Sequence, residues 1–247
     1  DDVQAITCGA DYHEDDQGNV RIDYILLGWA HSIRLYNLAV GRVPSWEHFT
    51  NEVFRTPFPW ASGDLEKPEL IMSLAGIDSG FMSHIIYEFC DKWPGRAIPL
   101  KGGTSGQAQS IKRSAINPES VRRKSRKIVK PGTLYTFDPL IFKDIVYSQI
   151  TAELLDGPGS IQFFAECPYW YTEQLCNEKR VKTKDKKGRV SYTWVEVSEH
   201  AECHGLDITV AAIVAGYLKG FQYLKPPEET KKQTKGRRIG KNQRFNN

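Results

Sequence analysis

Three aspartates stand at the boundaries of predicted elements and have a residue type that binds divalent cations. Asp11 ends the first predicted strand, Asp78 ends a short apolar strand, and Asp207 opens the last predicted helix. Carboxylates within a few ångströms of one another raise each other's pKa values, so such a cluster persists at neutral pH only when cations neutralise it. Two Mg²⁺ or Mn²⁺ ions about 3.5–4 Å apart would stabilise the attacking and leaving oxygens of phosphodiester cleavage. The pattern therefore suggests a phosphodiester hydrolase in which all three aspartates are catalytic metal ligands.

The first of these acids is carried by a predicted hairpin at the start of the chain. Residues 3–11 alternate at the two-residue period of a strand, with Asp11 at its end. A polar turn over residues 14–19 leads to a partner strand over residues 20–27, on which we expect Asp23 to face outward. A carboxylate projecting from a rigid sheet is well placed to bind a hard cation.

A third strand and a parallel unit follow this hairpin. Residues 31–40 alternate again, and Ser45 has the residue type of a helix N-cap. Residues 68–77 form a nearly continuous apolar run, which is typical of a strand buried on both faces. A helix through Cys90 and a strand over residues 96–100 complete a predicted parallel βαβ unit.

This order of elements indicates a ribonuclease-H-like α/β fold, a mixed sheet of an antiparallel three-stranded meander plus parallel strands, flanked by helices. In that architecture the first strand is central and lies beside the fourth. Asp11 and Asp78 should therefore converge at one edge of the sheet, and a later helix should bring Asp207 to the same place.

The second half of the chain has weaker signals. Residues 102–130 lack periodicity and are rich in Gly, Ser, Lys and Arg, so we expect a surface loop. Asp138, before Pro139, should cap the next helix and is a secondary candidate metal ligand. A basic hairpin is expected over residues 180–197 and the last helix over residues 205–223.

Composition supports one globular domain. The chain has 247 residues, of which 40% are hydrophobic, and it contains no apolar run of about 18 residues that would span a membrane. Its five cysteines show no Cys-x-x-Cys spacing, so reduced thiols are expected rather than a zinc site. We expect a nuclease domain over residues 1–224 and a basic, disordered tail over residues 225–247. Because the chain does not begin with Met, we expect it to be part of a longer protein.

The distribution of charge favours a polyanionic partner. Net charge is only +3, but most basic residues fall in segments 112–130, 179–189 and 225–244. Contacts to DNA phosphates should be salt-sensitive and largely independent of sequence, although solvated loops have the same composition. The glycine-rich stretches lack a complete phosphate-loop motif, so ATP hydrolysis is not expected. The residues expected to bind DNA are Lys101, Arg122, Arg123, Lys124, Arg126, Lys127, Lys182, Lys184, Lys186 and Lys187.

Five short segments resemble the nuclease half of the lambda-type (GpA) large terminase subunit of tailed phages. They are Cys8-Gly9-Ala10-Asp11-Tyr12-His13, Ile22 to Ala30 with its ending Leu27-Gly28-Trp29-Ala30, Ala75-Gly76-Ile77-Asp78-Ser79-Gly80, Ile98-Pro99-Leu100-Lys101-Gly102 and Gly205-Leu206-Asp207-Ile208-Thr209-Val210-Ala211-Ala212. Each motif is short, but their order and spacing together are fairly specific, and the likeness extends to about residue 223.

The resemblance implies a metal-dependent endonuclease that cuts concatemeric double-stranded DNA during viral genome packaging. The family's nuclease acids map onto Asp11, Asp78 and Asp207, with two Mg²⁺ or Mn²⁺ ions as cofactors. Implied partners are the portal ring, the small terminase subunit and an upstream ATPase domain of the same chain, in the host bacterial cytoplasm. One departure concerns residues 203–205, where Cys-His-Gly replaces the family's usual Asn-Glu before Leu-Asp.

Other interpretations remain open at this stage. Asp78 and Asp207 are also suited to a helix cap and a first-turn acid, with Glu199 or Glu202 as substitutes for Asp207. His204, one turn before Asp207, is a secondary candidate metal ligand. The alternative functions are a nuclease or recombinase of the same fold, of integrase or resolvase type, and a non-catalytic module that docks DNA or the portal.

Overall fold

The structure is a computed structural model that describes residues 2–59, 69–126, 130–154, 156–184, 188, 190–199 and 201–226, apart from the side chains of residues 124 and 125. The predicted basic tail lies outside these residues from position 227 onward. No helix within the described ranges is long and apolar enough to cross a bilayer. All five cysteines are free thiols, as expected from their spacing.

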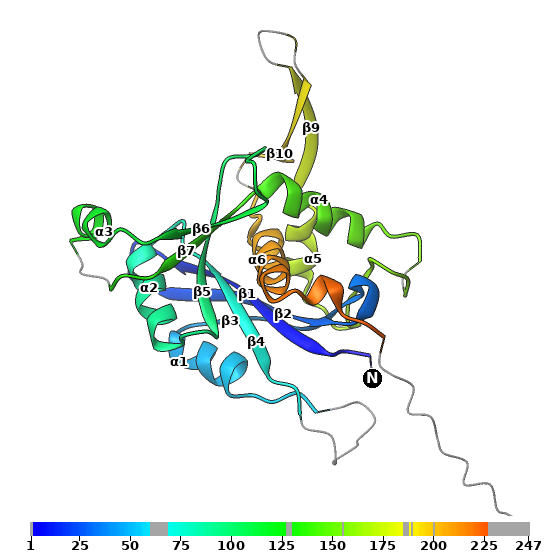
Figure 1. The fold of residues 1–247 in the computed structure, drawn as a ribbon, viewed down its shortest axis with the longest axis horizontal. Coiled ribbons are helices and arrows are strands. Elements are labelled where there is room, and N and C mark those ends of the chain that lie inside the picture. The colour runs from blue at the N-terminus through cyan, green and yellow to red at the C-terminus, as the bar shows by residue number, and fades with distance from the viewer. Residues whose placement is uncertain are drawn as a thin grey trace, which may run out of the picture.

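The described chain is built on one mixed sheet (Figure 1). Its strands are β1 (Ala5–Glu14), β2 (Val20–Trp29), β3 (Leu35–Val43), β4 (Met72–Asp78), β5 (Ala97–Gly102), β6 (Ile111–Ala115), β7 (Thr133–Phe137) and β8 (Ile161–Gln162). They run in the order β6-β7-β5-β4-β1-β2-β3-β8. β1 pairs antiparallel with β2 and parallel with β4, so the first strand is central and lies beside the fourth. The predicted ribonuclease-H-like α/β fold is confirmed.

Helices cover both faces of this sheet. The first group is α1 (Trp46–Phe49), continued by η2 (Thr50–Phe54), with α2 (Ser83–Lys92). The second group is α4 (Pro139–Ile150), α5 (Tyr169–Leu175) and α6 (His204–Lys219). The alternation of β1 separates the two cores, because Ile6, Cys8 and Ala10 pack with the first group while Ala5 packs with the second. Asp11 follows the alternation onto the α6 face.

Short elements complete the described chain. The turn η1 (His31–Ile33) lies between β2 and β3, the turn η3 (Phe221–Tyr223) follows α6, and the two turns contact each other. α3 (Pro118–Ser125) lies beyond α2 at the β6 end of the sheet (Figure 1). The hairpin of β9 (Glu178–Lys184) and β10 (Val190–Glu196) projects away from the sheet beyond α4 (Figure 1).

Two predictions about the second half of the chain need correction or adjustment. Residues 102–130 are not simply a loop, because they contain β6 and α3. β6 is an exposed edge strand without an apolar face, and α3 is a short helix capped by Asn117, so neither has a strong hydrophobic period. The third strand begins at Leu35 rather than at residue 31, since η1 precedes it.

Candidate active site

Two glycines allow α6 to lie directly against the backbone of the central strands. Gly9 and Gly76 are register partners in β1 and β4. A Cβ added at Gly9 would lie 1.8 Å from the Ile208 carbonyl oxygen, and one at Gly76 would lie 2.8 Å from the Ala211 carbonyl oxygen. Glycine in a strand interior commonly marks such close approach of another backbone. Contact at these two glycines therefore sets the height of α6 above the sheet.

This packing makes the three predicted catalytic aspartates electrostatic neighbours where the pairing of β1 with β4 ends, although β1 itself continues past Asp11 to Glu14. Ala10 pairs with Ile77, so Asp11 and Asp78 are the next residues on neighbouring parallel strands. Asp207 lies in the first turn of α6. Burial and the negative charges of Asp11 and Asp207 raise the pKa of Asp78 from 3.8 to about 6, whereas the Gly80 and Ser79 amides act in the opposite direction.

Lys143 from α4 is the cation nearest to Asp207 within the described residues. Its Nζ lies 3.4 Å from Asp207 Oδ1 and 2.5 Å from Glu178 Oε1. Burial raises the pKa of Asp207, and the Lys143 charge offsets part of that rise. The pKa of Lys143 is raised because Asp207 and Glu178 outweigh the effect of its own burial. The ion pairs thus link α4, β9 and α6 beside the acidic cluster.

Two histidines contact the same oxygen of Asp11. His204 Nδ1 lies 3.1 Å and His13 Nε2 lies 3.3 Å from Asp11 Oδ2. The two rings pack edge to face with centroids 4.1 Å apart. The hydrogen bond with Asp11 raises the pKa of His204, whereas burial lowers the pKa of His13. His204, a secondary candidate in the sequence, is therefore adjacent to the first aspartate, and His13 is a site residue that sequence reasoning missed.

Asp23 does not face outward as predicted, because its side chain is fully buried. It lies opposite Asp11 in the β1–β2 register and forms ion pairs with Arg21 (3.0 Å) and Arg42 (3.3 Å). Burial nevertheless raises the pKa of Asp23, since desolvation outweighs the two arginines. The signal in the sequence was the hairpin register, which places residue 23 on the face of Asp11.

Asp138 has the predicted N-cap role. Its Oδ1 accepts a hydrogen bond from the Leu140 amide (2.9 Å), and its Oδ2 accepts one from the Gly106 amide (2.6 Å). The carboxylate is fully buried, and both of its oxygens are occupied by backbone donors. The charged neighbours that shift the pKa values of Asp78 and Asp207 do not include Asp138. Within the described residues, Asp138 therefore acts as a helix cap and is not grouped with the three aspartates.

The predicted DNA-binding side chains lie at three separate places. Lys101 is exposed near the end of β5, Lys182 and Lys184 are exposed on β9, and the remaining described ones lie on or directly after α3. On the hairpin, Arg180 pairs with Asp144 of α4 at 2.9 Å, so its charge is partly neutralised. The described α3 side chains are those of Arg122, Arg123 and Arg126, whereas Lys127, Lys186, Lys187 and the side chain of Lys124 lie outside the described part.

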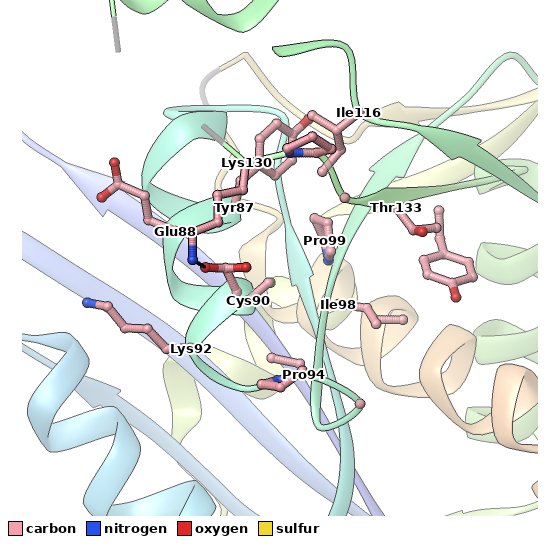
Figure 2. Close-up of a pocket in the computed structure, with 16 residues that line it drawn as sticks. Tyr87, Glu88, Cys90, Lys92, Pro94, Ile98, Pro99, Ile116, Lys130 and Thr133 are labelled. Atoms are coloured by element: carbon pink, nitrogen blue, oxygen red, sulfur yellow. Dashed lines mark hydrogen bonds and ion pairs between the residues drawn. The ribbon is translucent and has the colours of Figure 1, made fainter. Parts of the chain in front are cut away.

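A pocket of about 690 Å³ lies elsewhere, between α2, β5 and the segment that leads into β7 (Figure 2). Tyr87 and Cys90 of α2 and Pro99 of β5 contribute to its walls. Lys130 Nζ and Asp91 Oδ2 form an ion pair of 2.6 Å among the lining residues. None of the three candidate catalytic aspartates lines this pocket, so it is separate from the acidic site.

The acidic site has the donors that a hard divalent cation requires. Asp11, Asp78 and Asp207 offer carboxylate oxygens, which Mg²⁺ and Mn²⁺ prefer. The charged neighbours that raise the pKa of Asp78 are both negative, and among the described residues the groups that lower this pKa are the Gly80 and Ser79 amides. A half-buried carboxylate beside two other acids, with backbone amides as its partners within the described residues, fits a bound metal ion.

The fold and this acidic edge define a nuclease-like domain of the ribonuclease-H class. The chain matches the family model of the terminase large subunit gpA, endonuclease domain, over residues 1–230, and it belongs to that family. The resemblance seen in the short motifs is thereby confirmed, and the family's role is that of an endonuclease in bacteriophage DNA packaging. No curated protein matches the chain.

Proposed function

We propose that this domain is a divalent-metal-dependent endonuclease that cuts concatemeric double-stranded DNA during genome packaging. In this proposal Asp11, Asp78 and Asp207 are the catalytic metal ligands and hold two Mg²⁺ or Mn²⁺ ions. The observation that carries the proposal is the placement of the three acids: Asp11 and Asp78 follow paired residues of the neighbouring parallel strands β1 and β4, and Asp207 lies in the first turn of α6, which packs on those strands.

The bound ions would activate the attacking water and stabilise the charge that develops on the leaving 3′ oxygen. The protein's own contribution is positional. β1 and β4 hold two of the carboxylates at fixed register, and the close packing of α6 fixes the third. His204 and His13 orient Asp11 through its Oδ2, and Lys143 neutralises part of the charge on Asp207.

DNA would be held by contacts to its backbone rather than by reading of its bases. Lys182 and Lys184 are exposed on the projecting hairpin, and Arg122 and Arg123 are exposed on α3. These positions suit salt-dependent binding to phosphates over a length of duplex. Lys101, Arg126, Lys124, Lys127, Lys186 and Lys187 belong to the same proposal.

The family supports further proposals about the assembly in which the domain works. A packaging ATPase domain would precede it in the full chain, and the portal ring and small terminase subunit would be its partners. Its site of action would be the cytoplasm of the host bacterium. The nuclease domain would extend to about residue 224, with the basic segment 225–247 as a tail.

The test is a plasmid cleavage assay with purified wild-type protein and matched variants. Supercoiled plasmid is incubated with Mg²⁺, with Mn²⁺ or with EDTA, and nicked and linear products are quantified. We expect cleavage only with metal, and a loss of at least about 100-fold in Asp11→Ala and in Asp78→Ala, because each removes a ligand from the metal site. Asp16→Ala, in the exposed turn of the first hairpin, is the matched control and should cleave normally.

Two results would overturn the proposal. Equal cleavage in EDTA and in metal would show that the reaction does not depend on a metal ion. Unchanged cleavage in both site variants, each shown to be folded by circular dichroism, would show that Asp11 and Asp78 are not the catalytic ligands. A four-way junction offered in competition with linear duplex tests the resolvase-type alternative, since a junction-specific enzyme would cut the branched substrate first.

A further inference from the structure

The contacts around Asp11 contain a second set of potential metal donors that differs chemically from the three aspartates. Asp11 contributes Oδ2, His13 contributes Nε2 and His204 contributes Nδ1, and these atoms all lie within 4.8 Å of one another. The set has two imidazole nitrogens and one carboxylate oxygen. The aspartate cluster, in contrast, offers oxygen ligands alone.

The separations match those between neighbouring ligands of one ion. Transition metals hold nitrogen and oxygen donors at about 2.0–2.2 Å, which places adjacent donor atoms about 3.0–3.5 Å apart. The observed distances to Asp11 Oδ2 are 3.3 Å from His13 Nε2 and 3.1 Å from His204 Nδ1. The two rings pack edge to face with centroids 4.1 Å apart, and their two ligand nitrogens lie within 4.8 Å of each other.

The surroundings leave polar atoms of this cluster without hydrogen bonds. His13 Nε2 is buried and forms no hydrogen bond with the described residues, and the same holds for both carboxylate oxygens of Asp23. Asp23 is fully buried, and its Oδ2 lies 3.7 Å from His13 Nε2, although Arg21 and Arg42 form ion pairs with its other oxygen. Because Asp23 approaches His13 at Nε2, the same nitrogen that would bind the ion, it adds a buried negative charge beside the site that favours a cation there.

We propose that Asp11, His13 and His204 form a transition-metal site that accepts Mn²⁺, Co²⁺ or Zn²⁺ in preference to Mg²⁺. Imidazole nitrogen suits these ions, whereas Mg²⁺ strongly prefers oxygen ligands and retains its water. Because both histidines use Oδ2 of Asp11, this carboxylate could bridge the nitrogen-containing site and the aspartate cluster. The proposal extends the proposed nuclease function, since Asp11 belongs to both sites, but it concerns ion binding rather than cleavage.

Pulsed electron paramagnetic resonance of Mn²⁺ detects ligand nitrogens directly and provides the test. The full chain is stripped of metal with EDTA, desalted, and loaded with Mn²⁺ or Co²⁺. We expect a nitrogen modulation from Mn²⁺ in the wild-type protein and a visible absorption band from nitrogen-ligated Co²⁺. A large excess of Mg²⁺ should leave both signals in place.

Variants identify which side chains provide the nitrogen. His13→Ala and His204→Ala should each weaken Co²⁺ binding at least tenfold, and the double variant should lose the nitrogen signal. His84→Ala, on α2, is the matched control and should retain it. If the wild-type protein binds Mn²⁺ without a nitrogen signal, or if the folded double variant retains the signal, the proposal is wrong and the histidines only orient Asp11.

The test distinguishes failure of this proposal from failure of the nuclease function. Metal-dependent plasmid cleavage without nitrogen ligation would overturn only the transition-metal site. Nitrogen ligation without any cleavage would overturn the nuclease function and leave the metal site standing.

Discussion

Replacing Asp78 by asparagine should stabilise the metal-free protein at neutral pH, although it removes a proposed catalytic ligand. The native pKa of about 6 lies above the ordinary value of 3.8, so the native state binds the proton more tightly than the unfolded chain does. Stability therefore falls as pH rises through this interval, and the full penalty applies above about pH 6. A shift of this size corresponds to about 2–3 kcal/mol, the lower figure allowing for partial solvent contact of the side chain.

Asparagine retains the polar contact but removes the charge. The Gly80 amide donates a hydrogen bond of 3.0 Å to Asp78 Oδ1, and an amide oxygen can accept the same bond. We expect the melting temperature of Asp78→Asn in EDTA to exceed that of the wild type by about 5–10 °C at pH 7.5. At pH 4 the two proteins should melt nearly together, because the wild-type carboxyl is then largely protonated.

The assay is thermal unfolding followed by circular dichroism at both pH values, with and without Mn²⁺. Added Mn²⁺ should raise the melting temperature of the wild type more than that of the variant, since the ion binds the native carboxylate. Asp16→Asn, an exposed acid in the first turn, is the control and should show no such pH-dependent gain. A variant less stable than the wild type at pH 7.5 in EDTA would refute the argument that burial and the neighbouring acids destabilise the charged form of Asp78.

Three further predictions follow from the packing and charges around the site. Gly9→Ala should destabilise the fold by about 3 kcal/mol and abolish metal binding, because its Cβ would overlap the α6 backbone, as thermal melts and Mn²⁺ titration would show. Lys143→Met should move the pH at which Mn²⁺ binds to higher values, because the lysine lowers the pKa of Asp207 and a carboxyl must lose its proton to bind metal. Lys182→Ala should weaken binding to duplex DNA of any sequence and reduce the salt slope of affinity by about 1, as measured by fluorescence anisotropy.

Matched substitutions separate these effects from general damage. Gly102→Ala places its Cβ in open space and should leave the melting temperature and Mn²⁺ binding unchanged. Lys92→Met removes an exposed lysine from the end of α2 and should leave the pH dependence of Mn²⁺ binding unchanged. If a site variant and its control change the melting temperature or Mn²⁺ binding equally, the explanation given for the site variant is wrong.

The elements that could be predicted from the sequence are those with a strong local period. The first hairpin, the buried fourth strand and the last helix have regular apolar patterns, and together they define the order of a ribonuclease-H-like fold. β6 and α3 were missed because their stability depends on neighbours. β6 is held by hydrogen bonds to β7 and offers almost no buried side chain, and α3 buries little besides Val121.

The site was predicted less completely than the fold. Asp78 ends β4 and Asp207 lies in the first turn of α6, as the sequence predicted, whereas Asp11 lies inside β1, which continues to Glu14 rather than ending at residue 11. The family resemblance indicated the same three residues. The partners of these acids could not be found in the same way. Lys143 looks like any solvated lysine in its helix, and its contact with Asp207 exists only when α4 and α6 pack on one sheet face. Asp23 was placed outward because alternation gives the faces of a strand but does not say that both faces are covered.

The contact between Asp11 and His204 joins residues that are 193 positions apart in the chain. A polypeptide still emerging from the ribosome would possess β1 to β4 long before it possesses α6. Since α6 is largely buried and covers the central strands, nothing N-terminal to it can substitute for its side of the site. A nascent or truncated chain that ends before residue 204 would hold two of the three acids but not the third, so the proposed cutting activity would arise only after the domain has closed on its last helix.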